Sequence, residues 1–147
     1  MAPEQNWYAH LKLLDSWKSK ARLADRTLLY PPLNRAIGNL LHEARKKGLN
    51  VDVFETFRSP ERQVKLYNEG RSKIKAGGYH QFGLAADLVL KDAKGNWTWD
   101  NPKGYDLLAT LAVREGLDPG HFWKSFKDSP HMQSNNAIVL KKQWMGV

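Results

Sequence analysis

Apolar side chains recur at helical spacing in three stretches of this chain, and each stretch predicts an amphipathic helix. The first spans residues 7 to about 24. The second opens at Pro31-Pro32 and stops at Gly48, and the third opens at Asn101-Pro102 and stops at Gly116. The apolar faces are formed by Trp7, Leu11, Leu14, Trp17 and Ala21 in the first helix, by Leu33, Ile37, Leu40, Leu41 and Ala44 in the second, and by Tyr105, Leu108, Leu111 and Ala112 in the third.

Shorter runs between these helices predict strands. Residues 51–57 alternate between two faces, and residues 84–90 form an almost wholly apolar run that is typical of a buried strand. Residues 92–96 form a turn into Trp97-Thr98-Trp99, which indicates a hairpin. Two further short segments are expected to complete a small sheet, around residues 121–123 and 131–133.

A fourth helix is predicted by its capping residues. Ser59-Pro60-Glu61 combines a serine cap, a proline at the first helical position and an acid in the first turn. This helix should run to about Asn68 and stop at Gly70. The chain contains no repeat or internal linker, so one domain over residues 1–147 is expected, with residues 134–147 as a basic and apolar tail.

One carboxylate, Asp87, interrupts the apolar run of residues 84–90. A carboxylate desolvated there is costly unless another group pairs with it or it coordinates a metal ion. His80, in a glycine-bounded loop just upstream, is the natural second ligand. The best source of a third is Asp128-Ser129-Pro130-His131, where a carboxylate and a histidine stand three residues apart.

Two histidines and one carboxylate with an open fourth position form the ligand set of hydrolytic zinc sites. The same set serves non-haem iron oxygenases, so the residues alone leave the metal open. Asp128 adds a carboxylate beside a ligand, which is able to take a proton from an attacking water. A helix cap or turn residue before Ser129-Pro130 is the alternative role for Asp128.

Composition narrows the kinds of site, partner and cellular location that the protein can have. The absence of cysteine excludes disulfides and cysteine-based zinc sites. The formal charge of +8 favours an anionic partner, such as nucleic acid, an acidic membrane surface or bacterial wall polymers. Apolar runs fall short of the ~20 residues of a membrane-spanning helix. Residues 1–6 have neither the basic nor the apolar region of a signal peptide, so synthesis in the cytoplasm without an export signal is expected.

Several segments resemble one enzyme family. Residues 78–87 resemble the Ser-x-His-x-x-Gly-x-Ala-x-Asp signature of zinc D-alanyl-D-alanine carboxypeptidases and L-alanoyl-D-glutamate endopeptidases, and residues 128–131 are similar to their second motif. Residues 56–63 and 123–127 also match. The resemblance covers about residues 33–133 and is closest to single-domain phage endolysins.

The resemblance implies a role for each motif residue. It implies one zinc ion per chain with His80, Asp87 and His131 as ligands, Asp128 as general base, and Arg58 as the group that stabilises the scissile carbonyl or the oxyanion. The alternative role for Arg58 is a structural ion pair with Glu55 or Glu61. Further candidates, for substrate binding, are Gln63, Tyr79 and His121. The signature serine is Gly78 here, which removes a side-chain hydrogen bond to substrate at that position.

The family's fold is a small α+β domain with a mostly antiparallel sheet flanked by helices, in agreement with the predicted elements. The implied function is a zinc metallopeptidase that cuts peptidoglycan stem peptides at the L-alanoyl-D-glutamate bond, as a phage endolysin in host cell lysis. The open rim at Gly77-Gly78 favours an endopeptidase. The main alternative is a D-alanyl-D-alanine carboxypeptidase of wall remodelling. A basic nucleic-acid-binding module is less supported, because the lysines and arginines are spread along the chain without a recognition motif.

These interpretations define the expected partners. Bacterial peptidoglycan is the expected substrate, with no nucleic acid partner, and the protein is expected to be a monomer. It would be made in the host cytoplasm and act on the periplasmic wall after release. The tail either packs on the domain or makes peripheral contact with anionic envelope polymers.

Overall fold

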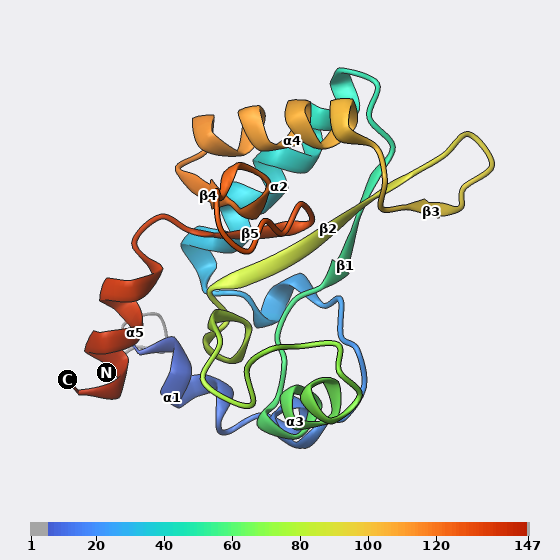
Figure 1. The fold of residues 1–147 in the computed structure, drawn as a ribbon. Coiled ribbons are helices and arrows are strands. Elements are labelled where there is room, and N and C mark those ends of the chain that lie inside the picture. The colour runs from blue at the N-terminus through green and yellow to red at the C-terminus, as the bar shows by residue number, and fades with distance from the viewer. Residues whose placement is uncertain (1–5, 147) are drawn as a thin grey trace.

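An antiparallel sheet forms the centre of the computed structural model, which describes residues 6–146 (Figure 1). Its strand order is β1-β2-β5-β4, and β3 pairs with the end of β2. Every one of these pairings is antiparallel, which confirms the expected α+β class. The strands are β1 (Val51–Glu55), β2 (Ala85–Lys91), β3 (Trp97–Thr98), β4 (Leu117–Pro119) and β5 (His131–Ser134).

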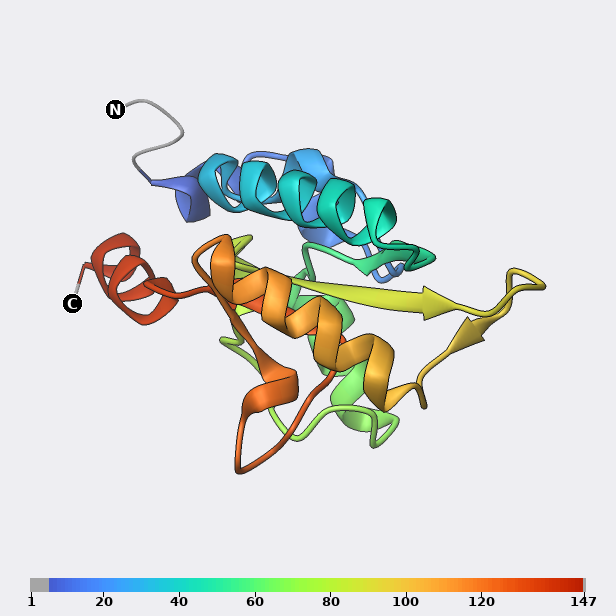
Figure 2. The same ribbon diagram turned by 90° about the horizontal axis from the view of Figure 1, so that it is seen from above.

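Two long helices cover one face of the sheet. α2 (Pro31–Lys46) and α4 (Pro102–Arg114) lie together on that face, and α3 (Pro60–Asn68) lies on the opposite side (Figures 1 and 2). Because side chains alternate along a strand, β2 directs Ala86, Leu88 and Leu90 into the core beneath α2 and α4. Asp87 therefore faces the opposite side of the sheet, where the candidate site forms.

Local signals in the sequence predicted the boundaries of three helices correctly. α2 begins at Pro31, α4 begins at Pro102, and α3 begins just after Ser59, whose hydroxyl accepts a hydrogen bond of 3.0 Å from the Arg62 backbone N–H. Gly48 and Gly116 follow the ends of α2 and α4 with positive φ, as glycine stops require.

The first predicted helix is wrong in its length. α1 spans only Trp7–Leu11, and a 3₁₀ turn, η2, follows at Asp15–Lys18. Trp7 and Leu11 are buried in a second apolar cluster, whereas the chain turns so that the Trp17 ring stacks on Phe57 with centroids 5.9 Å apart. A continuous helix would have kept Trp17 on the same stripe as Leu11. Another 3₁₀ turn, η3 (Arg26–Leu28), leads to α2.

The strand predicted around residues 121–123 is also misplaced. The paired residues are Leu117–Pro119, and residues 120–122 form the 3₁₀ turn η5. The Gly120 carbonyl accepts hydrogen bonds from the backbone N–H groups of Trp123 and Asp128, at 3.2 and 3.0 Å. These bonds close a turn at Gly120, so the ladder cannot continue past Pro119.

The tail packs back on the domain as α5 (Ala137–Met145), beside α1 (Figure 1). Ala137 and Trp144 are buried in the second cluster, and the Trp144 ring meets Tyr30 edge-on at 5.0 Å. Residues 1–5 and Val147 lie outside the described residues. The expectation that the N-terminus lacks the features of a signal peptide concerns mostly residues 1–5 and therefore lies outside them too. None of the helices within residues 6–146 is long and apolar enough to cross a bilayer.

Trp144→Ala should therefore destabilise the domain strongly. Replacing a buried tryptophan by alanine typically costs about 3–5 kcal/mol, because contacts are lost and a cavity remains. Urea denaturation would measure the change in the free energy of unfolding. Val139→Ala, on the exposed side of the same helix, is the matched control and should change it by less than about 0.5 kcal/mol. Equal stability of both variants would contradict the packing role of α5.

Candidate metal centre

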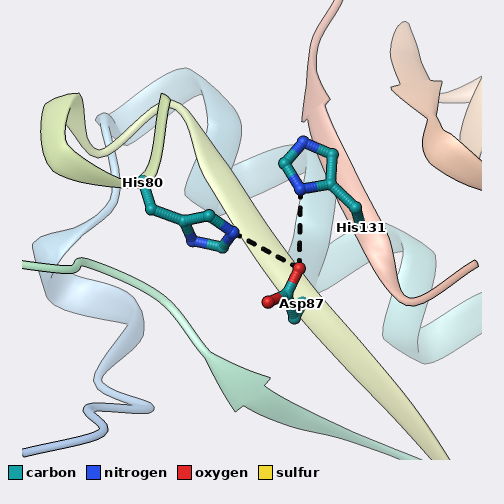
Figure 3. A group of neighbouring side chains, drawn as sticks. All are labelled: His80, Asp87 and His131. Atoms are coloured by element: carbon teal, nitrogen blue, oxygen red, sulfur yellow. Dashed lines mark ion pairs between the residues drawn. The ribbon is translucent and has the colours of Figure 1, made fainter. Parts of the chain in front are cut away.

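Three side chains from three different elements converge on one point (Figure 3). His80 lies on the 3₁₀ turn η4 (Tyr79–Phe82), Asp87 on β2 and His131 on β5. Asp87 and His131 are directly opposite each other in the strand register. One ligand atom from each residue lies within 4.8 Å of the others, so the group could hold a metal ion.

Hydrogen bonds orient both histidine rings. His80 Nδ1 lies 2.8 Å from the Thr56 carbonyl oxygen, and His131 Nε2 lies 2.8 Å from Gln133 Oε1. Because both oxygens accept, those ring nitrogens carry the hydrogens. His80 Nε2 and His131 Nδ1 are left with lone pairs that face Asp87 Oδ1, at 3.3 and 3.5 Å.

These contacts fit a metal ion. Asp87 Oδ1 is buried and makes no hydrogen bond among the described residues, and two nitrogen lone pairs point at it. Three lone pairs around one point repel one another unless a cation lies between them. Carbonyl groups behind both imidazoles are also typical of histidines that bind metal.

The pKa values reflect the same concentration of charge. Burial alone would raise the pKa of Asp87, yet the adjacent His80 and His131 rings hold that pKa well below its ordinary value. Burial alone would lower the pKa of His131, yet its contact with Asp87 raises it. Positive charge is therefore favoured at this point of the structure.

A glycine at the end of η4 helps to aim His80. Gly83 has φ of +67° and its N–H bonds to the His80 carbonyl oxygen at 3.3 Å. A Cβ at this position would lie 2.7 Å from the Trp7 ring and 2.8 Å from the Leu28 carbonyl oxygen. The signature glycine thus satisfies both the turn and the close approach of Trp7.

Arg58 lies against the same carboxylate. Its Nη2 is 3.2 Å from Asp87 Oδ2, and its Nε is 3.1 Å from Glu55 Oε1, an ion pair without hydrogen-bond alignment. Arg62 Nε lies 3.0 Å from Glu55 Oε2. Glu55 is therefore a buried anion shared by two arginines, and the structure contains the Arg58–Glu55 ion pair that the sequence offered as an alternative.

Asp128 lies at the rim of the centre. Its Oδ2 atom is 3.9 Å from His131 Nδ1, and its side chain is half-exposed. Burial raises the pKa of Asp128, and the negative charge of Asp87 raises it further. Gly120 allows the Asp128 backbone to approach this closely, because a Cβ at position 120 would overlap the Asp128 carbonyl oxygen.

With Asp128 as the expected general base, Gly120→Ala should lower turnover by displacing it. A misplacement of about 1 Å in a catalytic group can cost on the order of 100-fold in rate. Steady-state kinetics with metal analysis and circular dichroism would measure the effect. Ser125→Ala, exposed in the same loop, is the control and should retain the wild-type rate. A wild-type rate for Gly120→Ala would show that turnover does not depend on the position of the loop that holds Asp128.

The three expected substrate-binding residues have different environments. Tyr79 and Gln63 line the cleft beside His80, but the Gln63 amide nitrogen donates to Ser72 Oγ and the Ile74 carbonyl oxygen, both at 2.8 Å. Both ring nitrogens of His121 are engaged, with Ser129 Oγ at 2.8 Å and Asp106 Oδ1 at 2.5 Å. Substrate binding by these residues stays a prediction.

Two adjoining hollows meet at the centre. The first, of about 570 Å³, is lined by His80, His131 and the 74–79 loop, and Lys141 of α5 borders it. The second, of about 520 Å³, is lined by Asp87 and by residues of β1, α3 and the β3 hairpin. Arg58 and Asp128 line both hollows, so the two hollows adjoin at these residues, one beside His80 and His131 and the other beside Asp87.

Sequence reasoning missed three groups that support this site. They are the Thr56 carbonyl, Gln133 and Lys141. Gln133 stands two residues after His131, on the same side of a strand, so the strand period offered a signal for it. No local signal predicted Lys141, whose ammonium donates to the Gly77 carbonyl oxygen across 64 residues.

Comparisons with known proteins agree with this geometry. Residues 72–134 match the family model described as D-alanyl-D-alanine carboxypeptidase, of the peptidase M15 type. The chain is 34% identical over 136 residues to the peptidoglycan L-alanyl-D-glutamate endopeptidase CwlK of Bacillus subtilis, covering 80% of this chain and 81% of that protein. It is 33% identical over 116 residues to the L-alanyl-D-glutamate peptidase of Listeria phage A118, covering 78% of this chain and 38% of that protein.

A solved structure shares the fold. The crystal structure of the Serratia marcescens L-Ala D-Glu endopeptidase ChiX superposes with a TM-score of 0.65 at 26% identity, covering 83% of this chain and 96% of that one. Fold and site together define an α+β peptidase with a His–Asp–His group that could bind a metal. The chain belongs to the peptidase M15 family.

Proposed function

We propose that this protein is a zinc endopeptidase that cuts the L-alanoyl-D-glutamate bond of peptidoglycan stem peptides. The observation that carries the proposal is the pair of hollows that adjoin at Arg58 and Asp128, one beside His80 and His131 and the other beside Asp87. An exopeptidase needs a closed end that recognises a free terminal carboxylate. A stem peptide that extends in both directions from the scissile bond needs a cleft open at both ends.

Zinc is the metal that we assign to the site, one ion per chain. His80 Nε2, Asp87 Oδ1 and His131 Nδ1 would hold it, because these are the atoms with lone pairs directed at a common point. Two nitrogens and one carboxylate oxygen suit zinc. When bound there, zinc supplies a Lewis acid that polarises a peptide carbonyl and lowers the pKa of a water toward about 7.

The protein's own groups perform the proton transfers. Asp128, at the rim beside His131, takes a proton from the attacking water and returns it to the leaving amine. Arg58 provides fixed positive charge for the oxyanion. Because Arg58 also pairs with the buried Glu55, its replacement by alanine would remove a buried partner at a cost of about 3–5 kcal/mol. Arg58→Lys is the cleaner variant for testing the catalytic role.

Lys141 is suited to the acidic side of the substrate. Its ammonium borders the first hollow, where the Gly77 carbonyl oxygen fixes one of its hydrogens and the Tyr79 ring lies 5.6 Å away. The remaining N–H donors are available to a carboxylate of D-glutamate. Lys73, in the loop before Ile74, lies over the Phe126 ring, 4.7 Å from its centroid.

Digestion of purified peptidoglycan tests the bond assignment. We expect new free amino termini at D-glutamate, identified by mass spectrometry of the soluble products. The alternative, a D-alanyl-D-alanine carboxypeptidase, corresponds to the description of the matching family model. Release of D-alanine without new D-glutamate termini would establish that alternative and overturn the endopeptidase.

A role in host cell lysis is the biological setting that we propose, supported by the similarity to a phage peptidase. The enzyme would be made in the host cytoplasm, reach the wall after release and act there as a monomer. Added protein should lyse bacteria whose outer membrane has been permeabilised. If the turbidity of the permeabilised cells does not fall while purified wall is still degraded, the lytic role is contradicted.

A further inference from the structure

Three large aromatic side chains gather beside the proposed active site without joining the interior. Phe54, Trp97 and Trp99 belong to neither of the two apolar clusters found within residues 6–146. Trp97 is 52% exposed and Trp99 is 46% exposed. Both come from the β3 hairpin, which projects from the end of β2 (Figure 1). Core packing therefore does not explain these rings.

The three rings form a fixed surface, which we call the aromatic platform. Phe54 meets Trp97 and Trp99 edge-on, with centroids 5.0 and 4.9 Å apart. The Arg22 guanidinium lies over Phe54 at 4.4 Å and over Trp97 at 5.2 Å. Rings held in this way lose little conformational freedom when a ligand binds.

The backbone of β1 is adapted to this arrangement. The register with β2 shifts between Val53 and Glu55, so Phe54 is the extra residue of a β-bulge. Bulges beside functional sites re-aim side chains. Glu55 on one side of the bulge supports Arg58, and Phe54 joins the platform. The same irregularity therefore serves both the centre and the aromatic platform.

The aromatic platform lines the second hollow of the cleft. Asp87, Arg58 and Asp128 line that hollow as well, so the rings and the catalytic groups share one continuous surface. Its volume of about 520 Å³ lies within the ~300–1,000 Å³ of small-ligand sites. Arginine side chains, Arg62 and Arg71 among them, add hydrogen-bond donors to its wall.

The chemistry of the substrate requires a sugar near this centre. In peptidoglycan, the L-alanine of the stem is joined by an amide to the lactyl group of N-acetylmuramic acid. One amino acid and one lactyl unit separate the scissile carbonyl from the sugar, a reach of at most ~7 Å at ~3.3–3.6 Å per unit. An enzyme that cuts after this alanine in an intact wall must therefore accommodate the sugar next to its metal centre.

We infer that the aromatic platform is the subsite for this N-acetylated amino sugar, an inference that rests on the proposed bond specificity. The apolar face of a pyranose ring and an acetamido methyl group pack on aromatic rings, and the hydroxyl groups meet polar side chains at the edges. The first hollow, bordered by Lys141, is left for the acidic D-glutamate side. The two hollows thus assign a direction to the bound substrate.

Kinetics on two matched substrates test this subsite. N-acetylmuramyl-L-alanyl-D-glutamate and N-acetyl-L-alanyl-D-glutamate share the scissile bond and differ in the sugar. The wild type should prefer the sugar-bearing substrate in kcat/KM by about tenfold or more, as expected when two ring contacts contribute. The double variant Trp97→Ala/Trp99→Ala should lose most of this preference. Trp97→Phe/Trp99→Phe, which keeps aromatic rings, should retain much of it.

Leu13→Ala is the matched control, since Leu13 is 83% exposed and borders neither hollow. It should keep the wild-type ratio of the two kcat/KM values. An equal ratio in the wild type and the double alanine variant would overturn the sugar subsite while leaving the peptidase intact. Thermal denaturation of each variant establishes that the fold is retained.

A binding measurement separates this inference from the proposed function. N-acetylmuramyl-L-alanine has no scissile L-alanoyl-D-glutamate bond, so calorimetric titration reports binding without turnover. Its Kd should rise about tenfold in the double alanine variant. If the wild type cleaves neither substrate, the proposed function fails, and this titration still decides the subsite. If the double alanine variant keeps the wild-type affinity for the sugar ligand but binds phosphatidylglycerol vesicles more weakly, the aromatic platform is a membrane contact and the inference is overturned.

Discussion

His131→Ala is expected to abolish metal binding and activity together. The wild-type protein should hold one zinc ion per chain, bound through the three atoms that converge in Figure 3. Removal of one ligand leaves an incomplete set, and even loss of a supporting hydrogen bond typically costs about 10–100-fold in metal affinity. Zinc content, measured by plasma emission spectrometry, should therefore fall to background. Hydrolysis of purified peptidoglycan should fall to background with it.

Chelation should have the same effect on the wild type, and added zinc should restore activity. His42→Ala is the matched control, because His42 is exposed on α2, and it should keep both zinc and rate. Stoichiometric zinc in His131→Ala would remove His131 from the ligand set. Stoichiometric iron in the wild type, or full activity in excess chelator, would overturn the zinc assignment.

Supporting groups offer a finer test of the same centre. The Gln133 side chain orients His131 through the 2.8 Å contact at Nε2, and it carries no negative charge that binds metal. Gln133→Ala should therefore weaken zinc binding by about 10–100-fold without abolishing it. Competition with a chromogenic chelator would measure the difference. Unchanged zinc affinity would show that the ring orientation does not depend on Gln133.

Local signals in the sequence were sufficient for the helices whose ends they define. α2 begins at Pro31 because proline has no N–H that would be left unpaired in the first turn, whereas Ser59 and Asn101 begin helices because their side chains accept hydrogen bonds from free backbone N–H groups. The helix expected from residue 7 to about 24 had only periodicity to support it. In the structure the helix ends at Leu11, and Trp17 lies in a separate 3₁₀ turn where its ring stacks on Phe57.

The candidate site could be predicted only in part. The spacing of His80 and Asp87 and the pair Asp128 and His131 were readable because each motif is local. The contact between the motifs depends on the register that sets Asp87 opposite His131, which no spacing along the chain encodes. The bulge at Phe54 and the reach of Lys141 to the 77–78 turn likewise arise from the assembled fold.

Asp128→Asn is expected to separate catalysis from metal binding. The variant keeps the size of the side chain but removes its ability to accept and return a proton. General acid–base catalysis typically contributes about 100- to 10,000-fold, so kcat should fall by a factor in this range. Zinc content should stay at one per chain, because Asp128, whose Oδ2 lies 3.9 Å from His131 Nδ1, is not among the three residues whose ligand atoms converge.

The decisive comparison is between turnover and zinc content in the same preparation. Asp100→Asn, at an exposed position near the β3 hairpin, is the matched control and should leave both at wild-type values. Loss of zinc together with turnover would make Asp128 part of the metal site. A near-wild-type rate would transfer the proton step to another group. His121 is poorly placed for it, since both of its ring nitrogens are bonded to Ser129 and Asp106. Retained zinc with turnover reduced by a factor in the stated range is the result that requires a carboxylate at position 128.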